Sequence, residues 1–144
     1  MAELPAALRA RYPDANTFVF GDSEALCDRL LALVRSGKKT ATCGAVRDYT
    51  AEGEVLPVVG RRDVALEWDG RPALVIQTVE VTIRRFCDVD ADFALSEGED
   101  DSLEGWQRGH AAYFARNGGF TPELELVCER FVLVEDLAGT GESN

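Results

Sequence analysis

Two apolar segments that meet at Asp69 and Gly70 constrain the fold of this chain more than any other feature. Residues 63–86 read DVALEWDGRPALVIQTVEVTIRRF. An Asp-Gly pair between apolar runs is typical of a tight β-hairpin, so we predict an antiparallel strand on each side of it. Strands and helices do not alternate regularly along the rest of the chain, which argues against a doubly wound parallel sheet.

Two helices are predicted between the strands. The first begins after Asp22 or Ser23, either of which can cap its N-terminus, and ends at Gly37. The second begins after Ser102 and ends at the glycine pair 118–119. The fold class that follows is α+β, a small mixed β-barrel with flanking helices.

The remaining segments complete this organisation. We expect a strand over residues 40–46, a loop over 47–62, an acidic connector over 87–101 with one short helical turn, and a closing strand over 123–137. The chain is then divided into a helical N-terminal extension (1–16), one domain (17–135) and a disordered tail (136–144).

The charge limits the choice of substrate. The formal net charge of −11 disfavours a long polyanion and favours a small, weakly charged substrate, although a local basic pocket stays compatible with it. No apolar stretch is long enough to cross a membrane, and the N-terminus lacks a signal-peptide pattern, so we expect a cytoplasmic protein. Four cysteines without a C-x-x-C pair and a single histidine predict no metal site of their own.

Two adjacent lysines stand where the first helix meets the next strand, in the sequence SGKKTAT. Thr40 and Thr42 share one face of that strand, and Lys39 can fold towards the Thr42 hydroxyl. A lysine whose pKa is lowered by burial can act as the base for a hydroxyl. The alternative is structural, because lysines such as Lys38 complement a helix dipole and threonine favours strands.

An acidic run, EGEDD, precedes the second helix. Its carboxylates can stabilise the N-terminus of that helix. One of them, such as Glu99, can instead complete a proton-handling triad with a lysine and a threonine. A third possibility is that the run binds a hard divalent cation such as magnesium.

Further side chains are candidates for substrate binding. Trp106 and His110 share one helix stripe, where a lone histidine is more often a core residue than a ligand-binding one. Arg47 and Tyr49 in the expected loop can bond to a base or stack on it. Arg130, if it points inward, needs an acidic partner such as Glu99 or Glu129.

The ordered set of motifs resembles the bacterial ASCH domain family. The resemblance covers Thr17 to Val134 and includes SGKKTAT, EGEVLPVVG, EGEDDSLEGW, H-x-x-x-F and VCERFVLV. It implies a barrel similar to the PUA domain of RNA-modifying enzymes, with a cleft for RNA or a nucleotide. One small branch is similar to amidohydrolases that remove acyl groups from the exocyclic amine of cytidine. Its lysine, threonine and glutamate match Lys39, Thr42 and Glu99.

Two functions are therefore expected, with a ligand-sensing domain as a third option. The first is a cofactor-free amidohydrolase of N-acylated cytidine, with Lys39, Thr42 and Glu99 as its triad and a small nucleoside as its partner. The second follows a longer branch of the family that is linked to ribonuclease activity. It is an RNA-binding module or a ribonuclease acting on single-stranded RNA with a possible divalent metal. In that second function Lys38, Lys39, Arg47 and Arg130 contact phosphate, and Tyr49 stacks on a base. For the cleft as a whole, the predicted substrate-binding residues are Lys38, Thr40, Arg47, Tyr49, Trp106, His110 and Arg130.

Overall fold

A five-stranded mixed sheet forms the centre of the protein in the computed structural model, which describes residues 4–137. Its strands, in chain order, are β1 (Thr17–Phe18), β2 (Ala41–Ala45), β3 (Arg62–Leu66), β4 (Pro72–Arg85) and β5 (Glu125–Asp136). They lie in the order β1-β3-β4-β5-β2. The β1–β3 pair is parallel and the other pairs are antiparallel, which confirms the predicted mixed α+β class.

The predicted hairpin at Asp69 and Gly70 is confirmed. Strands β3 and β4 pair from Arg62 opposite Gln77 to Leu66 opposite Pro72. Gly70 takes the left-handed backbone conformation, with φ of 94°, that this turn requires. The Asp69 carboxylate accepts a hydrogen bond of 3.1 Å from the Arg71 backbone N–H, which closes the turn.

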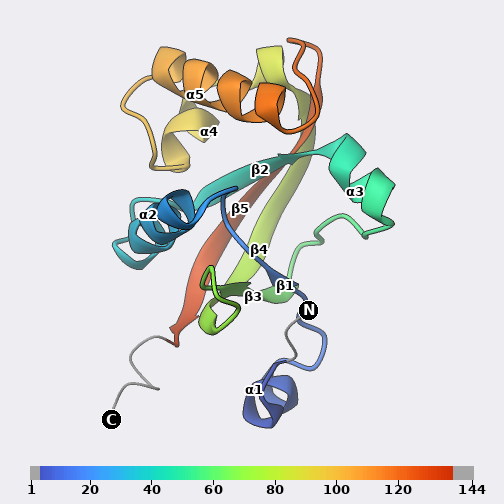
Figure 1. The fold of residues 1–144 in the computed structure, drawn as a ribbon, viewed down its shortest axis with the longest axis vertical. Coiled ribbons are helices and arrows are strands. Elements are labelled where there is room, and N and C mark those ends of the chain that lie inside the picture. The colour runs from blue at the N-terminus through green and yellow to red at the C-terminus, as the bar shows by residue number, and fades with distance from the viewer. Residues whose placement is uncertain (1–3, 138–144) are drawn as a thin grey trace.

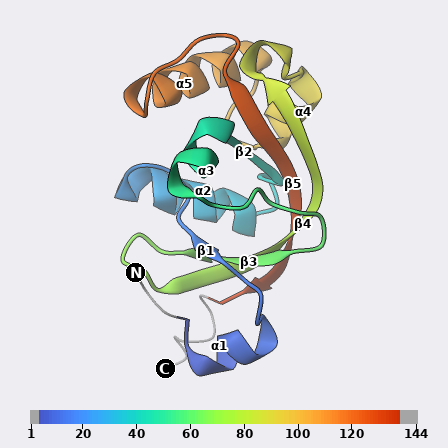
Figure 2. The same cartoon turned by 90° about the vertical axis from the view of Figure 1, so that its right-hand side faces the viewer.

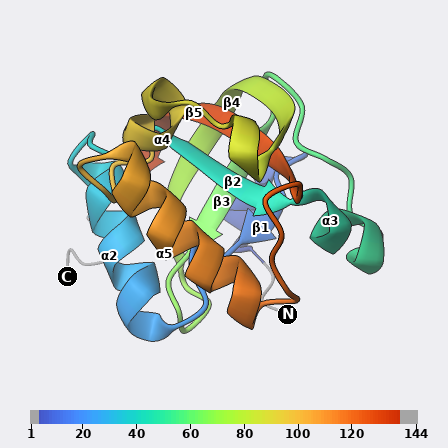
Figure 3. The same cartoon turned by 90° about the horizontal axis from the view of Figure 1, so that it is seen from above.

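Helices cover the sheet at several places, and all three views show their arrangement (Figures 1, 2 and 3). They are α1 (Ala6–Arg11), α2 (Glu24–Arg35), α3 (Val46–Glu52), α4 (Ala91–Ser96) and α5 (Leu103–Arg116), with a 3₁₀ turn η1 (Phe86–Asp88). Both predicted caps are present. The Ser23 hydroxyl accepts from the Leu26 N–H, and the Ser102 hydroxyl accepts from the Gly105 N–H.

The segment expected to be a loop over 47–62 begins instead as helix α3, so that prediction is wrong for its first part. Figure 3 shows α3 continuing directly from the end of β2. No residue of α3 is buried, so it has no apolar stripe for a sequence pattern to reveal. Gly53 ends it in the left-handed conformation, with φ of 67°.

Both termini of the described chain pack against the sheet. Leu8 of α1 contacts an apolar cluster that includes Val64, Val75 and Leu137. Asp136 is the last residue of β5 and Leu137 is buried, so the prediction of a tail from residue 136 is wrong for these two positions. Residues 138–144 of that predicted tail lie outside the described residues.

The position of the edge strands matters for function. In the part of the chain that the structure describes, β1 and β2 are the two edges of the sheet and do not pair with each other. The sheet curls, so that the barrel is open between them (Figure 2). Helix α2 packs inside this curl through Cys27, Leu30, Leu31 and Val34.

Candidate functional site

A buried ion-pair cluster surrounds Lys39. Its ammonium lies 2.7 Å from a Glu99 carboxylate oxygen and 3.2 Å from one of Glu97, and the lysine is only 1% exposed. Lys39 precedes β2 by two residues. Strand alternation therefore puts it on the same face as Ala41 and Cys43, towards α5.

Glu97 lies at the centre of this cluster and is also 1% exposed. One carboxylate oxygen accepts a hydrogen bond of 3.2 Å from the indole N–H of Trp106, and the other lies 3.4 Å from Nε2 of His110. Trp106 and His110 are one helical turn apart on α5 and stack with ring centroids 4.3 Å apart. Nδ1 of His110 lies 3.0 Å from the Trp106 carbonyl oxygen, which orients the imidazole.

The backbone explains why two acids can reach one lysine. Gly98 stands between Glu97 and Glu99 with φ of 75°. A Cβ atom on it would lie 2.7 Å from the carbonyl carbon of Lys38 and still closer to the carbonyl oxygen. Only glycine combines this conformation with so close an approach, so the Glu-Gly-Glu turn presses against the start of β2.

Charge compensation sets the protonation states in the cluster. Burial alone would lower the pKa of Lys39, but the charges of Glu97 and Glu99 outweigh it and raise that pKa. Burial opposes ionisation of Glu97, yet Lys39 and then His110 lower its pKa to about 2. Burial also disfavours the charged form of His110, but the hydrogen bond and charge of Glu97 raise its pKa.

These directions correct one expectation. We expected burial to lower the pKa of Lys39 so that it could act as a base towards Thr42. With its raised pKa, Lys39 keeps its proton at neutral pH. Its side-chain hydrogen bonds within residues 4–137 go to Glu97 and Glu99, and none goes to Thr42.

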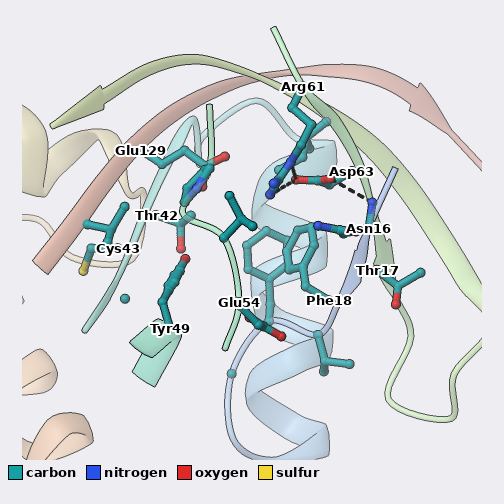
Figure 4. Close-up of a pocket in the computed structure, with 18 of the residues that line it drawn as sticks. Asn16, Thr17, Phe18, Thr42, Cys43, Tyr49, Glu54, Arg61, Asp63 and Glu129 are labelled. Carbon is teal, nitrogen blue, oxygen red and sulfur yellow. Dashed lines mark hydrogen bonds and ion pairs between the residues drawn. The ribbon is translucent and has the colours of Figure 1, made fainter. Parts of the chain in front are cut away.

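A cleft with two lobes lies beside the cluster. The larger lobe has a volume of about 560 Å³ and the smaller about 210 Å³. Residues of both edge strands, among them Thr17 and Thr42, line the larger lobe, so it fills the opening of the barrel (Figure 4). The two lobes adjoin because they share lining residues, namely Phe20, Gly21, Thr42, Cys43 and Tyr113.

Several predicted site residues meet at this cleft. Thr42 lines both lobes, Tyr49 lines the larger one, and Glu99 and His110 line the smaller one. In Figure 4 the side chains of Thr42 and Tyr49 point towards each other. Burial raises the pKa of Tyr49 to about 12, so its phenol stays neutral. Trp106 is fully buried and acts on the site through its hydrogen bond to Glu97.

Four other predicted substrate-binding residues lie away from both lobes. Lys38 is exposed, and the Thr40 hydroxyl donates to the Ser96 carbonyl. Arg47 donates to the carbonyl of Gly119 at 2.6 Å and so ties α3 to the end of α5. These contacts give Thr40 and Arg47 structural roles.

Arg130 is the fourth of these residues. It pairs with Asp92 of α4 at 3.0 Å and with Glu80 of β4 at 3.4 Å. The expected partners Glu99 and Glu129 are therefore wrong. The guanidinium also lies 5.3 Å from the centroid of the Phe93 ring.

Sequence reasoning missed Glu97 and Glu129 as members of the site. Glu97 lies in an acidic segment, where acids are usually solvated, and Glu129 lies beside Arg130 in an apolar strand, where it was considered only as a partner of that arginine. The available signal for Glu97 was Gly98, the residue after it. A glycine allows the backbone to turn tightly and pass close to another segment, so the acids on both sides of it can reach the same partner. The signal for Glu129 was strand alternation, because it shares a face with Val127 and Phe131, which are both buried.

Three of the cluster side chains also form a possible metal-binding group. The ligand atoms of Cys43, Glu97 and His110 lie within 4.8 Å of one another. Burial raises the pKa of the Cys43 thiol well above its usual range, and Lys39 already neutralises Glu97. A cation would have to displace these protons and compete with the ammonium group.

The comparisons with known proteins agree with this fold. The family model of the ASCH domain matches residues 16–135. The chain belongs to the ASCH domain family. Its membership implies an RNA-related function. A search of curated proteins gave no match.

Solved structures of similar proteins support the same assignment. Protein EF3133 from Enterococcus faecalis V583, of the family model DUF984, is 31% identical with a TM-score of 0.82, over 95% of this chain and 89% of that one. An ASCH domain from Lactobacillus crispatus JV V101 is 31% identical with a TM-score of 0.79, over 92% and 87%. The hypothetical protein PH0355, at 10% identity and a TM-score of 0.54 over 83% and 97%, shares the fold alone.

The helices of the described part of the chain were compared with the length and hydropathy that a membrane span requires. None of the helices within residues 4–137 is both long and apolar enough to cross a bilayer.

Proposed function

We propose that this ASCH domain is an amidohydrolase that removes the acyl group from an N-acylated cytidine or a similar small nucleoside. The observation that carries the proposal is the Lys39–Glu97–Glu99 cluster, which lies beside a two-lobed cleft with Thr42 at the junction of the lobes. Buried titratable groups in a cleft with several polar side chains are typical of catalytic sites.

The shapes and linings of the lobes suit the two parts of such a substrate. The larger lobe is of the size that small-molecule sites have, and it suits a nucleoside. The smaller lobe has an apolar wall formed by Phe20, Leu26, Leu30 and Phe114, which suits a short acyl chain. The amide bond would then cross the junction at Thr42, within reach of Glu99.

The charge of the cleft favours an uncharged substrate over RNA. Acids outnumber bases in its lining, with Glu54, Asp63, Glu129, Glu97, Glu99 and Asp100 against Arg29, Arg61, Arg116 and His110. The bases are also engaged, since Arg29 donates to the Glu99 carbonyl and Arg116 pairs with Asp22. Because these bases are already engaged, the lining offers little attraction to a phosphate group, whereas a neutral nucleoside needs none.

The chemistry that we propose keeps Lys39 charged. Glu99 takes a proton from a water molecule, whose oxygen attacks the acyl carbon. The Thr42 hydroxyl donates to the carbonyl oxygen, where negative charge develops. When the carbon–nitrogen bond breaks, Glu99 returns the proton to the leaving amine, which gives cytidine and a carboxylic acid. Lys39, whose ammonium lies 2.7 Å from a Glu99 carboxylate oxygen, orients Glu99 throughout and keeps its own proton.

The test is hydrolysis of N-acetylcytidine by the purified protein, followed by chromatography. Glu99→Gln should abolish turnover and preserve the fold, because the amide retains the shape and loses the basic oxygen. Asp101→Asn is the matched control, since Asp101 is an exposed acid two residues away. Full activity of Glu99→Gln would refute the assignment of the base, and inactivity of the unaltered protein on N-acylated nucleosides would refute the function.

A second candidate is a metal-assisted ribonuclease, and the Cys43, Glu97 and His110 group is the observation that favours it. These side chains would hold the divalent ion. Incubation of labelled single-stranded RNA with and without divalent metal tests it. Metal-dependent cleavage that His110→Ala removes would support this candidate, and intact RNA under both conditions would exclude it.

A further inference from the structure

A buried acid without an ion-pair partner within the described residues faces the larger lobe. Glu129 on β5 lies opposite Thr42 in the β2–β5 register and is 8% exposed. Its single side-chain hydrogen bond in residues 4–137 comes from the Thr78 hydroxyl, at 2.5 Å, and uses one carboxylate oxygen. The second oxygen is therefore left for the cavity, which Glu129 lines (Figure 4).

Arg61, the one base in the lining of the larger lobe, pairs with Asp63 and forms no ion pair with Glu129 among the described residues. Arg61 points both Nε and Nη2 at one oxygen of Asp63, at 3.0 and 2.9 Å. The other oxygen of Asp63 accepts from the Asn16 backbone N–H. Burial, followed by repulsion from Asp63, raises the pKa of Glu129, against the lowering effects of Thr78 and Arg61. A buried carboxyl without an ion-pair partner destabilises the fold, and such groups are typical of sites that bind a ligand. We therefore expect Glu129 to bind a group from outside the chain.

The rest of the lobe defines the shape of that partner. Phe18, Phe20 and Tyr49 line it with aromatic rings, and Ile76 and Val127 add apolar surface. The rings of Phe18 and Phe20 meet edge to face at 4.9 Å, which leaves a fixed wall. Aromatic walls with one hydrogen-bonding carboxyl suit a flat heterocycle better than a chain-like ligand.

We propose that Glu129 reads the hydrogen-bonding edge of a cytosine-type base held in the larger lobe. Its free oxygen accepts the exocyclic N–H. This assignment rests on the proposed function for the choice of a nucleoside. It adds the residue that selects the base and the lobe in which the base lies.

The experiment measures equilibrium binding, so it needs no turnover. Cytidine and its analogue without the exocyclic amine, pyrimidin-2-one riboside, are titrated by calorimetry into the unaltered protein and Glu129→Gln. Held by Thr78, the glutamine points its NH₂ group at the cavity and cannot accept the exocyclic N–H. Cytidine binding should weaken ten- to a hundredfold, and binding of the analogue should change less than threefold.

Two controls separate recognition of the base by Glu129 from a general disturbance of the cleft. Glu125→Gln, an exposed acid on the same strand, should leave both affinities unchanged. Glu129→Ala provides a second variant that lacks the acceptor, and thermal unfolding shows that each variant is folded. Equal losses for both ligands would overturn the inference, as would unchanged cytidine affinity in both Glu129 variants or no binding of cytidine to the unaltered protein.

Failure of this base site is distinguishable from failure of the proposed reaction. Cytidine binding that depends on Glu129, without hydrolysis of any N-acylated nucleoside, would refute the reaction and retain the base site. Hydrolysis of N-acetylcytidine together with an unaltered cytidine affinity in Glu129→Gln would refute the base site and retain the reaction.

Discussion

Replacement of Lys39 by methionine tests the buried cluster most directly. Methionine keeps much of the side-chain length and removes the charge, which leaves Glu97 buried at 1% exposure without its ammonium partner. Removal of one partner from a buried pair costs about 3–5 kcal/mol. Glu97 keeps its contacts with Trp106 and His110, so we expect the lower end of that range, about 3 kcal/mol.

A loss of this size is measurable and leaves the domain folded. A chain of 144 residues has an unfolding free energy of roughly 7–20 kcal/mol, and the loss should lower Tm by roughly 6–12 °C. Urea unfolding followed by tryptophan fluorescence gives the free-energy difference. Lys38→Met is the matched control, because Lys38 is exposed and its change should stay within about 0.5 kcal/mol.

The loss of unfolding free energy in Lys39→Met should depend on pH. In the unaltered protein the pKa of Glu97 is lowered to about 2, so its contribution to stability is present above the unfolded pKa and is lost as pH falls towards 2. Without Lys39, burial raises that pKa, and protonation relieves the penalty as pH falls. The difference in unfolding free energy between the unaltered protein and Lys39→Met should therefore become smaller from pH 7 to pH 4.

Two results would refute this reasoning. One is a loss under about 0.5 kcal/mol at pH 7, and the other is a gap that widens at pH 4. The double variant Lys39→Met with Glu97→Gln should recover most of the stability, since it removes the orphaned charge.

Three further predictions concern other parts of the molecule. Gly98→Ala should destabilise the fold by about 2 kcal/mol or more in urea unfolding, because its Cβ would meet the Lys38 backbone; a change below about 0.5 kcal/mol would contradict the close contact. Glu129→Gln should raise stability at pH 8 more than at pH 4, because a carboxyl with a raised pKa penalises the folded state only once pH exceeds its unfolded pKa; equal effects at both pH values would contradict its burial. Cys87 is the exposed thiol and should react first with a maleimide, well before the buried Cys27, as mass spectrometry of the labelled peptides would show; labelling of Cys27 at the same rate would contradict the packing of α2.

Much of the fold followed from local signals in the sequence. The hairpin at Asp69, the helix caps at Ser23 and Ser102, and the closing strand each depend on residues close together in the chain. Helix α3 was missed because its stability comes from its place after β2 and from contacts such as that of Arg47 with Gly119, and no apolar stripe marks it.

The site was harder to predict because its parts are distant in sequence. Lys39 and Glu97 are 58 positions apart, and their pairing depends on the backbone contact at Gly98. Because Glu97 and Glu99 are distant from Lys39 in the sequence, the direction of the Lys39 pKa shift could not be predicted. Burial lowers that pKa, whereas the two carboxylates raise it. The family resemblance brought Lys39, Thr42 and Glu99 together, but the protonation state required the structure.

The distribution of charge has a consequence for the solvent in which the protein is most stable. Lys39, His110, Glu97 and Glu99 balance one another when the histidine is protonated, and their burial shields them from dissolved ions. The formal charge of −11 therefore belongs mainly to the surface, where acids repel each other across water. Dissolved salt screens this repulsion and hardly weakens the buried attraction. The folded state should therefore gain stability as ionic strength rises.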